Sequence, residues 1–277
     1  MAASAQPESP APKPAGPVLR VFLADLHLDG TAAPKAKTFR ALMARLAEEA
    51  ERSPVELYLL GDVFEFWDEY HRQALARFET DIQALAAAHQ AGVAITILKG
   101  NKDFLYGRYA QERFGARLFG DGGRIDFPDA RKVWLEHGDL LCTADTRYLR
   151  YRKLVRSWPV RTLFRLLPWS LARRMVERVS KTARADRDKK VRAVTDIDLD
   201  AARKRLEQTG CQLLMCGHTH APQATDLNLG RRLIVLPAWC DTMAGYRERN
   251  AGLVAVRFDL DGTPSPARFD GSPDPNQ

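Results

Sequence analysis

The sequence lacks the features of several protein classes. It has no run of about 18 apolar residues, so no membrane-spanning helix is expected. It has four cysteines and no Cys-x-x-Cys pair, which argues against a disulfide scaffold and a structural zinc site. The first 17 residues hold Ala, Pro and Ser without an apolar core, so we expect no secretory signal and a cytoplasmic location.

Positive charge is concentrated in one segment. The chain has 42 basic and 35 acidic residues, a net charge of +7. Residues 147–190 contain fifteen Lys or Arg against three acidic residues, so this segment carries +12 and the rest of the chain −5. Such a segment indicates a face that meets nucleic acid, anionic lipid or a phosphorylated substrate. Its interleaved Leu, Phe and Trp residues are typical of a lipid-handling or membrane-surface element.

The chain reads as one α/β domain over residues 18–261. Strands are expected over 18–24, 55–60, 93–98, 132–136, 212–216 and 232–236, and helices over about 39–50 and 71–89. This alternation predicts sheets flanked by helices. The basic stretch at about 145–192 has a helical period broken by two prolines, which predicts an inserted helical cap. Residues 1–17 and 262–277 are rich in Pro, Gly, Ser and Ala and are expected to be disordered tails.

Five polar clusters each follow a predicted strand. They are D-L-H (25–27), G-D-V-F-E (61–65), G-N-K-D (100–103), H-G-D (137–139) and G-H-T-H (217–220). Ligands bind at the carboxyl ends of strands in α/β sheets, so we expect these clusters to meet at one site. In extended chain, each Asp-x-His or His-x-His pair would project to one side of the sheet. His, Asp and Asn without thiolate suit Mn²⁺, Fe²⁺ or Zn²⁺. His71 and His89 lie on predicted helices and are expected to be structural.

The ordered set D-x-H, G-D-x-x-E, G-N-x-D, H-G-D and G-H-x-H resembles the calcineurin-like metallophosphoesterase superfamily. The resemblance implies an α/β sandwich of mixed sheets flanked by helices, with two divalent metal ions, which we expect to be Mn²⁺. By motif, the first metal is held by Asp25, His27 and His220, the second by Asn101, His137 and His218, and both by Asp62. The resemblance also gives Asp103, Asp139 and Glu65 the role of orienting ligands or turns.

A narrower resemblance covers about residues 19–254. The segments A-D-L-H-L, L-G-D-V-F-E-F-W, G-N-K-D-F-L, H-G-D-L-L-C-T-A-D-T-R-Y and G-H-T-H-A-P resemble the UDP-2,3-diacylglucosamine pyrophosphatases. That family acts in lipid A biosynthesis. The resemblance implies that water, activated by two metals, attacks the α-phosphorus of UDP-2,3-diacylglucosamine. The products would be UMP and 2,3-diacylglucosamine 1-phosphate (lipid X).

The same resemblance implies which residues meet the substrate. Lys102 is the expected catalytic residue, and the expected substrate contacts are Asn101, Lys102, Asp145, Tyr148, Lys190 and His218. The family usually has Arg at the position of Lys102 and Arg at that of Ala221. The cap is about three residues longer than the family pattern. Counting back from Asp196 favours Lys190, whereas counting forward from Ser180 favours Arg184 and Arg187.

The predicted cap indicates which partners the protein is expected to bind. In this reading its Leu, Phe and Trp residues line an acyl pocket, while its basic residues meet phosphates or anionic headgroups. A lipid-linked nucleotide sugar is then the substrate, and the enzyme associates peripherally with the cytoplasmic face of the inner membrane, without a nucleic-acid partner. The sequence leaves the oligomeric state open.

Two other functions stay open from the sequence. One is a calcineurin-like phosphodiesterase or phosphatase acting on a soluble nucleotide, which would need no apolar cap. The other is a nucleic-acid-binding surface formed by the basic segment. The segment has no recognisable binding motif, and its aromatic residues sit among leucines as core residues would.

Overall fold

The computed structural model describes residues 16–187 and 196–269, with side chains as far as Val179 in the first segment. The α-helices are α1 (Pro34–Ala50), α2 (Glu79–Gln90), α3 (Arg108–Phe114), α4 (Thr146–Val155), α5 (Trp158–Leu166), α6 (Trp169–Arg187), α8 (Leu199–Thr209) and α9 (Trp239–Thr242). The strands are β1 (Leu19–Leu23), β2 (Val55–Leu59), β3 (Ala94–Leu98), β4 (Arg117–Gly120), β5 (Gly122–Asp126), β6 (Lys132–Glu136), β7 (Leu213–Cys216), β8 (Gln223–Asp226), β9 (Arg232–Val235), β10 (Ala244–Arg249), β11 (Gly252–Phe258) and β12 (Pro264–Pro266).

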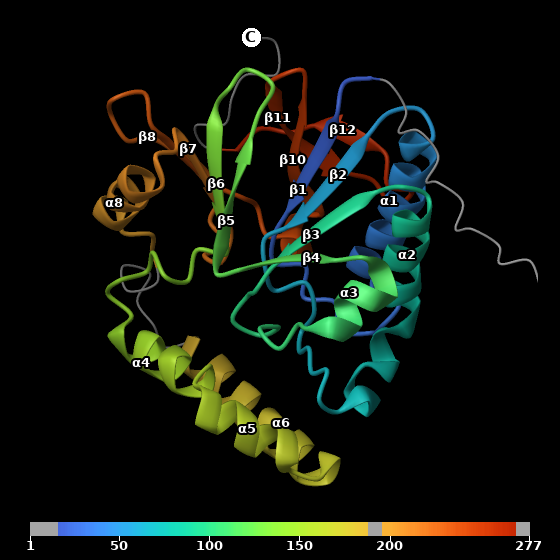
Figure 1. Ribbon diagram of the computed structural model, residues 1–277, viewed down its shortest axis with the longest axis vertical. Coiled ribbons are helices and arrows are strands. Elements are labelled where there is room, and N and C mark those ends of the chain that lie inside the picture. The colour runs from blue at the N-terminus through green and yellow to red at the C-terminus, as the bar shows by residue number, and fades with distance from the viewer. Residues whose placement is uncertain (1–15, 188–195, 270–277) are drawn as a thin grey trace, which may run out of the picture.

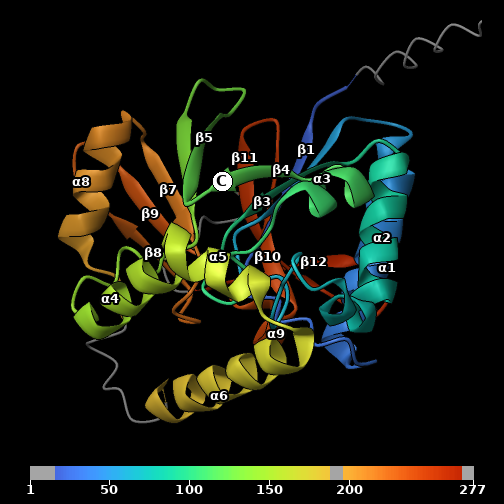
Figure 2. The same cartoon turned by 60° about the horizontal axis from the view of Figure 1, so that its bottom comes forward.

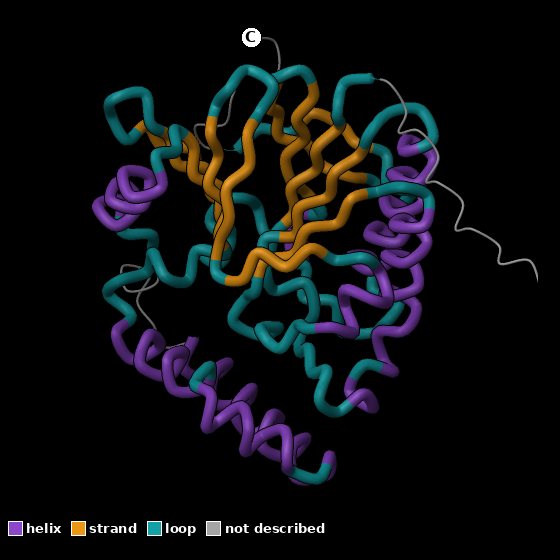
Figure 3. Tube along the Cα trace, in the orientation of Figure 1, coloured by secondary structure: helices purple, strands orange, loops and turns teal. Residues whose placement is uncertain are grey.

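Two mixed sheets lie face to face (Figure 1). The first has the strand order β12-β11-β10-β1-β2-β3-β4, and β1 to β4 are parallel to one another. The second has the order β5-β6-β7-β9-β8, with β6, β7 and β9 parallel. Helices α1 and α2 cover the outer face of the first sheet and α8 covers that of the second (Figure 3).

The alternation of side chains along β1 and β2 builds the layers. Val21 and Leu57 belong to the core cluster shared with α1 and α2, whereas Phe22 and Tyr58 belong to the cluster between the two sheets. The two inner rings stack at 5.0 Å between centroids. Because successive side chains of a strand point to opposite faces, strands buried on both sides are mostly apolar, and the charged exceptions in β1 and β2, Arg20 and Glu56, pair with each other at 2.8 Å. The predicted α/β sandwich follows from this pattern.

Helices α4, α5 and α6 form a separate layer below both sheets in Figure 1, and Figure 2 brings it forward. They occupy the stretch for which the sequence predicts an inserted cap. Asp145 caps α4 by accepting the N–H of Tyr148, and Pro159 lies in the first turn of α5. The cap packs on the body through the buried cluster Leu105, Phe164 and Ala172. None of the helices in the described segments has the length and apolar composition needed to cross a membrane.

Two local predictions are wrong. The helix expected over 71–89 is α-helical only from Glu79, after two short 3₁₀ turns, Arg72–Ala74 and Ala76–Phe78. Asp68 accepts the backbone N–H groups of Tyr70 and His71, and such a local turn competes with helix formation. The disordered tail expected from residue 262 is contradicted at residues 264–266, which pair with β11 as strand β12.

Candidate metal centre

The five polar clusters meet where the two sheets face the cap. Each follows the carboxyl end of its strand: β1, β2 and β3 in the first sheet, β6 and β7 in the second. Backbone hydrogen bonds join neighbouring clusters, from the N–H of Asp25 to Gly61 O at 3.2 Å and from the N–H of Gly217 to His137 O at 2.8 Å. Residues far apart in sequence are thereby brought to one edge of the sandwich.

Left-handed backbone conformations aim the side chains. Asp25, His27, Asp62, His218 and His220 have φ values of 53°, 46°, 50°, 76° and 55°. Such values cost non-glycine residues roughly 1–2 kcal/mol each and are concentrated at functional sites. The sequence correctly predicts that the clusters converge at the carboxyl ends of the strands, but its account of how the ligand pairs are oriented is wrong. The ligand pairs lie in tight turns beyond the strands, so extended-chain alternation does not orient them.

A first group of side chains gathers around His220. Its Nε2 lies 3.3 Å from His27 Nε2 and 3.9 Å from Asp25 Oδ1. That Asp25 oxygen is buried without a hydrogen-bond partner among the described residues, while Oδ2 accepts the N–H of His218 at 2.7 Å. A buried carboxylate oxygen facing two imidazoles is a donor set that suits a divalent cation.

A second group gathers around His137. Its Nε2 lies 2.9 Å from Asn101 Oδ1 and 3.2 Å from His218 Nδ1. Its Nδ1 lies 2.8 Å from Leu60 O, which fixes the ring so that Nε2 faces the site. Asp241 orients His220 in the same way, since its Oδ2 lies 2.8 Å from His220 Nδ1.

Asp62 stands between the two groups. Its Oδ2 lies 3.8 Å from His27 Nε2, and its Oδ1 lies 3.9 Å from His137 Nε2. One carboxylate oxygen therefore faces each group. Asp62 is buried, and burial would raise its pKa, but His137, His27 and Lys102 lower it below its ordinary value.

Negative charge dominates this centre. Burial alone would lower the pKa of His137, but the carboxylates of Asp62, Asp25 and Asp139 raise it to about 9. Burial and the neighbouring His137 lower the pKa of His218. Buried carboxylates thus draw positive charge to this point, which is what a cation site requires.

Two groups of described side chains have ligand atoms close enough to share an ion: Asp25, Asp62 and His137, and His27, His220 and Cys240. Cys240 is a residue that the sequence prediction missed. Its Sγ lies 4.0 Å from His220 Nδ1, and burial raises its pKa to about 12. The available signal was the position of Cys240 and Asp241 shortly after β9, on the short helix α9.

Asp103, Asp139 and Glu65 hold the surrounding chain in place. The carboxylate of Asp103 accepts the N–H groups of Asp62, Val63, Phe64 and Gly100 and the hydroxyl of Tyr106. Asp139 accepts the Tyr148 hydroxyl at 2.6 Å and Arg152 Nε at 2.7 Å, which ties α4 to the end of β6. Glu65 accepts the ammonium group of Lys102 at 2.8 Å.

The predicted substrate contacts differ in how directly they touch this centre. Lys102 Nζ is 3.2 Å from His27 Nδ1, and its backbone N–H donates to Asp62 Oδ1 at 2.9 Å. The Tyr148 ring lies 6.1 Å from that of His218, and Asp145 is the N-cap of the same helix. Lys190 lies outside the described residues. The side chains of Arg184 and Arg187 also lie outside them.

Comparison with known proteins agrees with this geometry. The model of the family described as calcineurin-like phosphoesterase matches residues 20–222, so the fold and the site define a calcineurin-like phosphoesterase. That family binds divalent metals, and the donor set described above fits them.

Curated relatives narrow the class. The chain is 35% identical over 223 residues to the UDP-2,3-diacylglucosamine hydrolase of Aeromonas salmonicida, covering 79% of this chain and 85% of that protein. It is 33% identical over 226 residues to that of Vibrio cholerae (79% and 90%) and 30% identical over 257 residues to that of Pseudomonas fluorescens (91% and 99%). The chain belongs to the UDP-2,3-diacylglucosamine hydrolase family and is a metal-dependent hydrolase. Both resemblances drawn from the motifs are confirmed.

Solved structures are more distant. Vacuolar protein sorting 29 from Cryptosporidium parvum is similar with a TM-score of 0.47 at 15% identity, over 91% of this chain and 96% of that one. This likeness has no bearing on activity.

Proposed function

We propose that this chain hydrolyses the pyrophosphate bond of UDP-2,3-diacylglucosamine in lipid A biosynthesis. Water attacks the α-phosphorus, and the products are UMP and 2,3-diacylglucosamine 1-phosphate. The observation that carries the proposal is the position of the ligand cluster beside a cap rich in apolar side chains, joined to it through Asp139 and α4. The curated relatives named for this substrate, which match most of the chain, support it.

The ligand assignment extends this proposal. Asp25, His27 and His220 would hold one cation, Asn101, His137 and His218 would hold the other, and Asp62 would serve both. When bound, the cations make hydroxide available near neutral pH and neutralise charge on the phosphoryl oxygens. The two-sided placement of Asp62, with one oxygen near His27 and the other near His137, supports the sharing. The nitrogen and oxygen donors suit Mn²⁺, which we propose as the ion.

Lys102 is the proposed catalytic cation of the protein itself. Glu65 holds its ammonium group beside His27, at the edge of the ligand cluster. From there it can neutralise charge that develops on a phosphoryl oxygen. A lysine makes this contact as a compact point charge, without the planar fork of an arginine.

The substrate-binding residues lie on the cap side of the cluster. We assign the sugar phosphate to Asn101, Lys102 and His218, with Asp145, Tyr148 and Lys190 as contacts from the cap. The apolar cluster between cap and body, Leu105, Phe164 and Ala172, with Phe66 and Phe104 partly buried against it, is the proposed acyl-chain site. A soluble nucleotide would have no use for such a surface.

We also propose peripheral association with the cytoplasmic face of the inner membrane. The cap carries exposed large apolar residues, among them Leu154, Trp158, Leu163 and Leu166, beside its arginines. Apolar side chains that enter the interface and basic groups that meet anionic headgroups are the two components of such binding.

The test is ³¹P NMR of the purified protein with Mn²⁺ and UDP-2,3-diacylglucosamine, beside the unacylated UDP-GlcNAc. Formation of UMP and a sugar 1-phosphate from the acylated substrate alone is the expected result. Equal cleavage of both substrates would instead favour a phosphodiesterase of soluble nucleotides. Repeating the assay with Zn²⁺, Fe²⁺ and Mg²⁺ after chelation tests the choice of Mn²⁺.

A further inference from the structure

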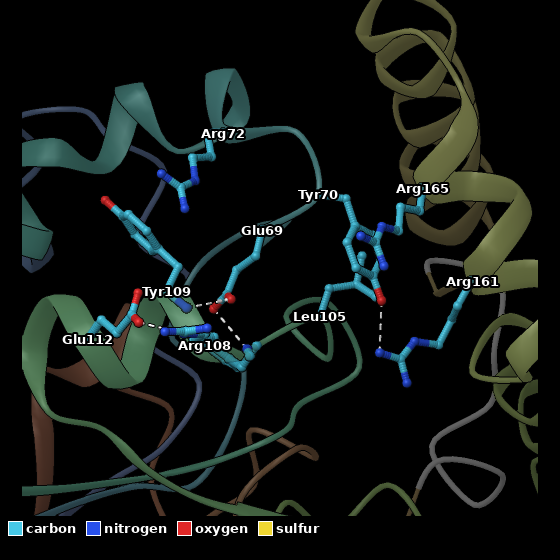
Figure 4. A pocket seen from close by; sticks show the side chains of 11 residues that line it. Glu69, Tyr70, Arg72, Leu105, Arg108, Tyr109, Glu112, Arg161 and Arg165 are labelled. Atoms are coloured by element: carbon cyan, nitrogen blue, oxygen red, sulfur yellow. Dashed lines mark hydrogen bonds and ion pairs between the residues drawn. The ribbon is translucent and has the colours of Figure 1, made fainter.

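A cavity lies between the body and the cap, apart from the candidate metal centre. Its volume is about 510 Å³, and none of the seven predicted metal ligands lines it. The lining comes from the segment before α2, from the start of α3 and from α5 (Figure 4). It consists of Glu69, Tyr70, Arg72, Leu105, Tyr106, Gly107, Arg108, Tyr109, Glu112, Arg161 and Arg165.

The carboxylates of the cavity are already engaged. Glu112 pairs with Arg108 at 2.5 Å. Glu69 accepts the backbone N–H groups of Gly107, Tyr109 and Ala110 and the indole N–H of Trp67. Neither carboxylate forms an ion pair with Arg72, Arg161 or Arg165 in the described part of the chain, and the lining, with four arginines against two glutamates, keeps a positive net charge.

Three arginines face the cavity without a carboxylate partner in the described part of the chain. Arg161 Nη2 donates to the Tyr70 hydroxyl at 2.8 Å, and its Nε is buried without a hydrogen-bond partner there. The guanidinium of Arg165 lies 5.9 Å from the centre of the Tyr70 ring, and that of Arg72 lies 5.4 Å from the centre of the Tyr109 ring. Figure 4 shows Arg161 and Arg165 on the cap side and Arg72 on the body side.

The neighbouring charges add to this excess. Burial and the positive charges of Arg161 and Arg156 lower the pKa of Lys99. Asp121 and Glu69 oppose this effect on Lys99, but Asp121 is already paired with both Arg156 and Arg152. Several positive side chains lie close together here, and one buried N–H group, Arg161 Nε, has no partner among the described residues. Such an arrangement stabilises a bound anion.

We propose that this cavity binds a phosphate group, in a site separate from the metal centre. Guanidinium groups recognise phosphate through charge-assisted hydrogen bonds, and here they line the cavity from both the cap and the body. A phosphate bound by Arg161 and Arg165 would lie beside Tyr70, where α5 of the cap meets the body. The proposal concerns binding alone and does not rest on the proposed hydrolysis.

The phosphate can come from a phospholipid headgroup or from a soluble phosphate compound. Helix α5 also exposes Trp158, Leu163 and Leu166. Arginines beside an exposed apolar face are typical of helices that lie at a membrane surface. The experiment therefore has a soluble arm and a membrane arm.

The soluble arm measures binding of inorganic phosphate and glycerol 3-phosphate to the metal-loaded full chain by calorimetry. The membrane arm measures sedimentation with phosphatidylcholine vesicles with and without phosphatidylglycerol. The test variant is Arg161→Gln with Arg165→Gln. The control, Arg150→Gln with Lys153→Gln, removes two positive charges from α4, outside the cavity lining. Both variants keep the candidate metal centre. Phosphate bound at that centre therefore contributes equally to both and does not affect the difference between them.

The test variant should lose at least roughly fivefold in affinity in one arm or both, and the control should stay within about twofold of the wild type. Loss in both arms assigns the site to phosphate groups in general. Loss with vesicles alone assigns it to a lipid headgroup, and loss in solution alone to a free phosphate compound. Behaviour equal to that of the control in both arms overturns the proposal. Arg72→Gln repeats the test from the body side if the α5 variant does not fold.

Discussion

His71 joins the body of the protein to its cap by bridging Asp68 and Leu167. Its Nε2 lies 2.7 Å from the backbone oxygen of Leu167, in the turn between α5 and α6, and its Nδ1 lies 2.7 Å from Asp68 Oδ2. The ring is buried and packs against Phe164 and Trp169 of the cap at centroid distances of 5.4 and 5.7 Å. One imidazole thus contacts both cap helices that face this part of the body.

Replacing His71 should loosen the cap. His71→Ala removes two buried hydrogen bonds and the ring contacts, at an expected cost of about 2–4 kcal/mol. Hydrogen exchange measured by mass spectrometry should show faster exchange in α5 and α6, with the sheets unchanged. His89→Ala is the control, because His89 is exposed and lies in the last turn of α2, a helix that packs against α1 and α3. Equal exchange of the cap in both variants would contradict the role given to His71.

The sequence predicts the strands that carry the site better than those that complete the sheets. Short apolar stretches in β1, β2, β3, β6 and β7 mark them as buried strands, although β1 and β2 each carry one charged residue, Arg20 and Glu56. Strand β10 has no such stretch, because Arg247, Glu248 and Arg249 fill its second half, and Glu248 is buried in an ion pair with Arg20 of β1 at 2.7 Å. Only the tertiary pairing of β1 with β10 brings these charges together.

The site could be predicted as a set of residues but not as a geometry. Motif order identifies Asp62 and His137, whereas the separate orientation of the two Asp62 oxygens depends on left-handed turns that no local pattern reveals. Cys240 and Asp241 were missed for the same reason, because they reach His220 only through the fold. His71 is expected from the sequence to be structural and on a helix; its structural role comes from contact with a turn 96 positions away, which no local pattern reveals.

Removing Asp62 should abolish turnover. Asp62→Ala deletes the carboxylate shared by the two groups, so we expect activity below about 1% of wild type and a fall in bound metal measured by mass spectrometry. His137→Ala should lose activity and bound metal in the same way, and its circular dichroism spectrum should show that the fold is retained. Asp126→Ala removes an exposed carboxylate at the end of β5 and serves as the control. Near-normal activity of the Asp62 variant would refute the shared-ligand arrangement.

Removing the Lys102 side chain should lower the catalytic rate without changing the amount of bound metal. Lys102→Ala deletes the ammonium group but keeps the backbone N–H that donates to Asp62. We expect kcat to fall about 10²-fold while metal content stays at the wild-type level. Lys102→Arg should restore much of the loss, since a positive charge returns beside Glu65. Lys132→Ala, at an exposed position on β6, is the control. Loss of metal from Lys102→Ala would show a role in holding the ligand cluster instead.

The exposed apolar residues of α5 should matter only when the substrate carries acyl chains. Leu163 and Leu166 are 63% and 74% exposed, so replacing both with Ser should change the stability by less than about 0.5 kcal/mol each. Burying two such side chains against lipid or acyl chains is worth about 1.5–3 kcal/mol each. We therefore expect kcat/KM for UDP-2,3-diacylglucosamine in mixed micelles or vesicles to fall at least roughly tenfold.

A matched control exists for this change. Leu229 and Leu260 are 88% and 63% exposed and lie in loops outside the cap, so Leu229→Ser with Leu260→Ser removes the same chemistry from another surface. The ratio of kcat/KM for acylated and unacylated substrate should fall for the α5 variant and stay near the wild-type value for the control. An equal fall on both substrates would mean that the α5 variant damages the centre itself. If the two double variants gave the same ratio, the cap's apolar face would have no part in handling the acyl chains.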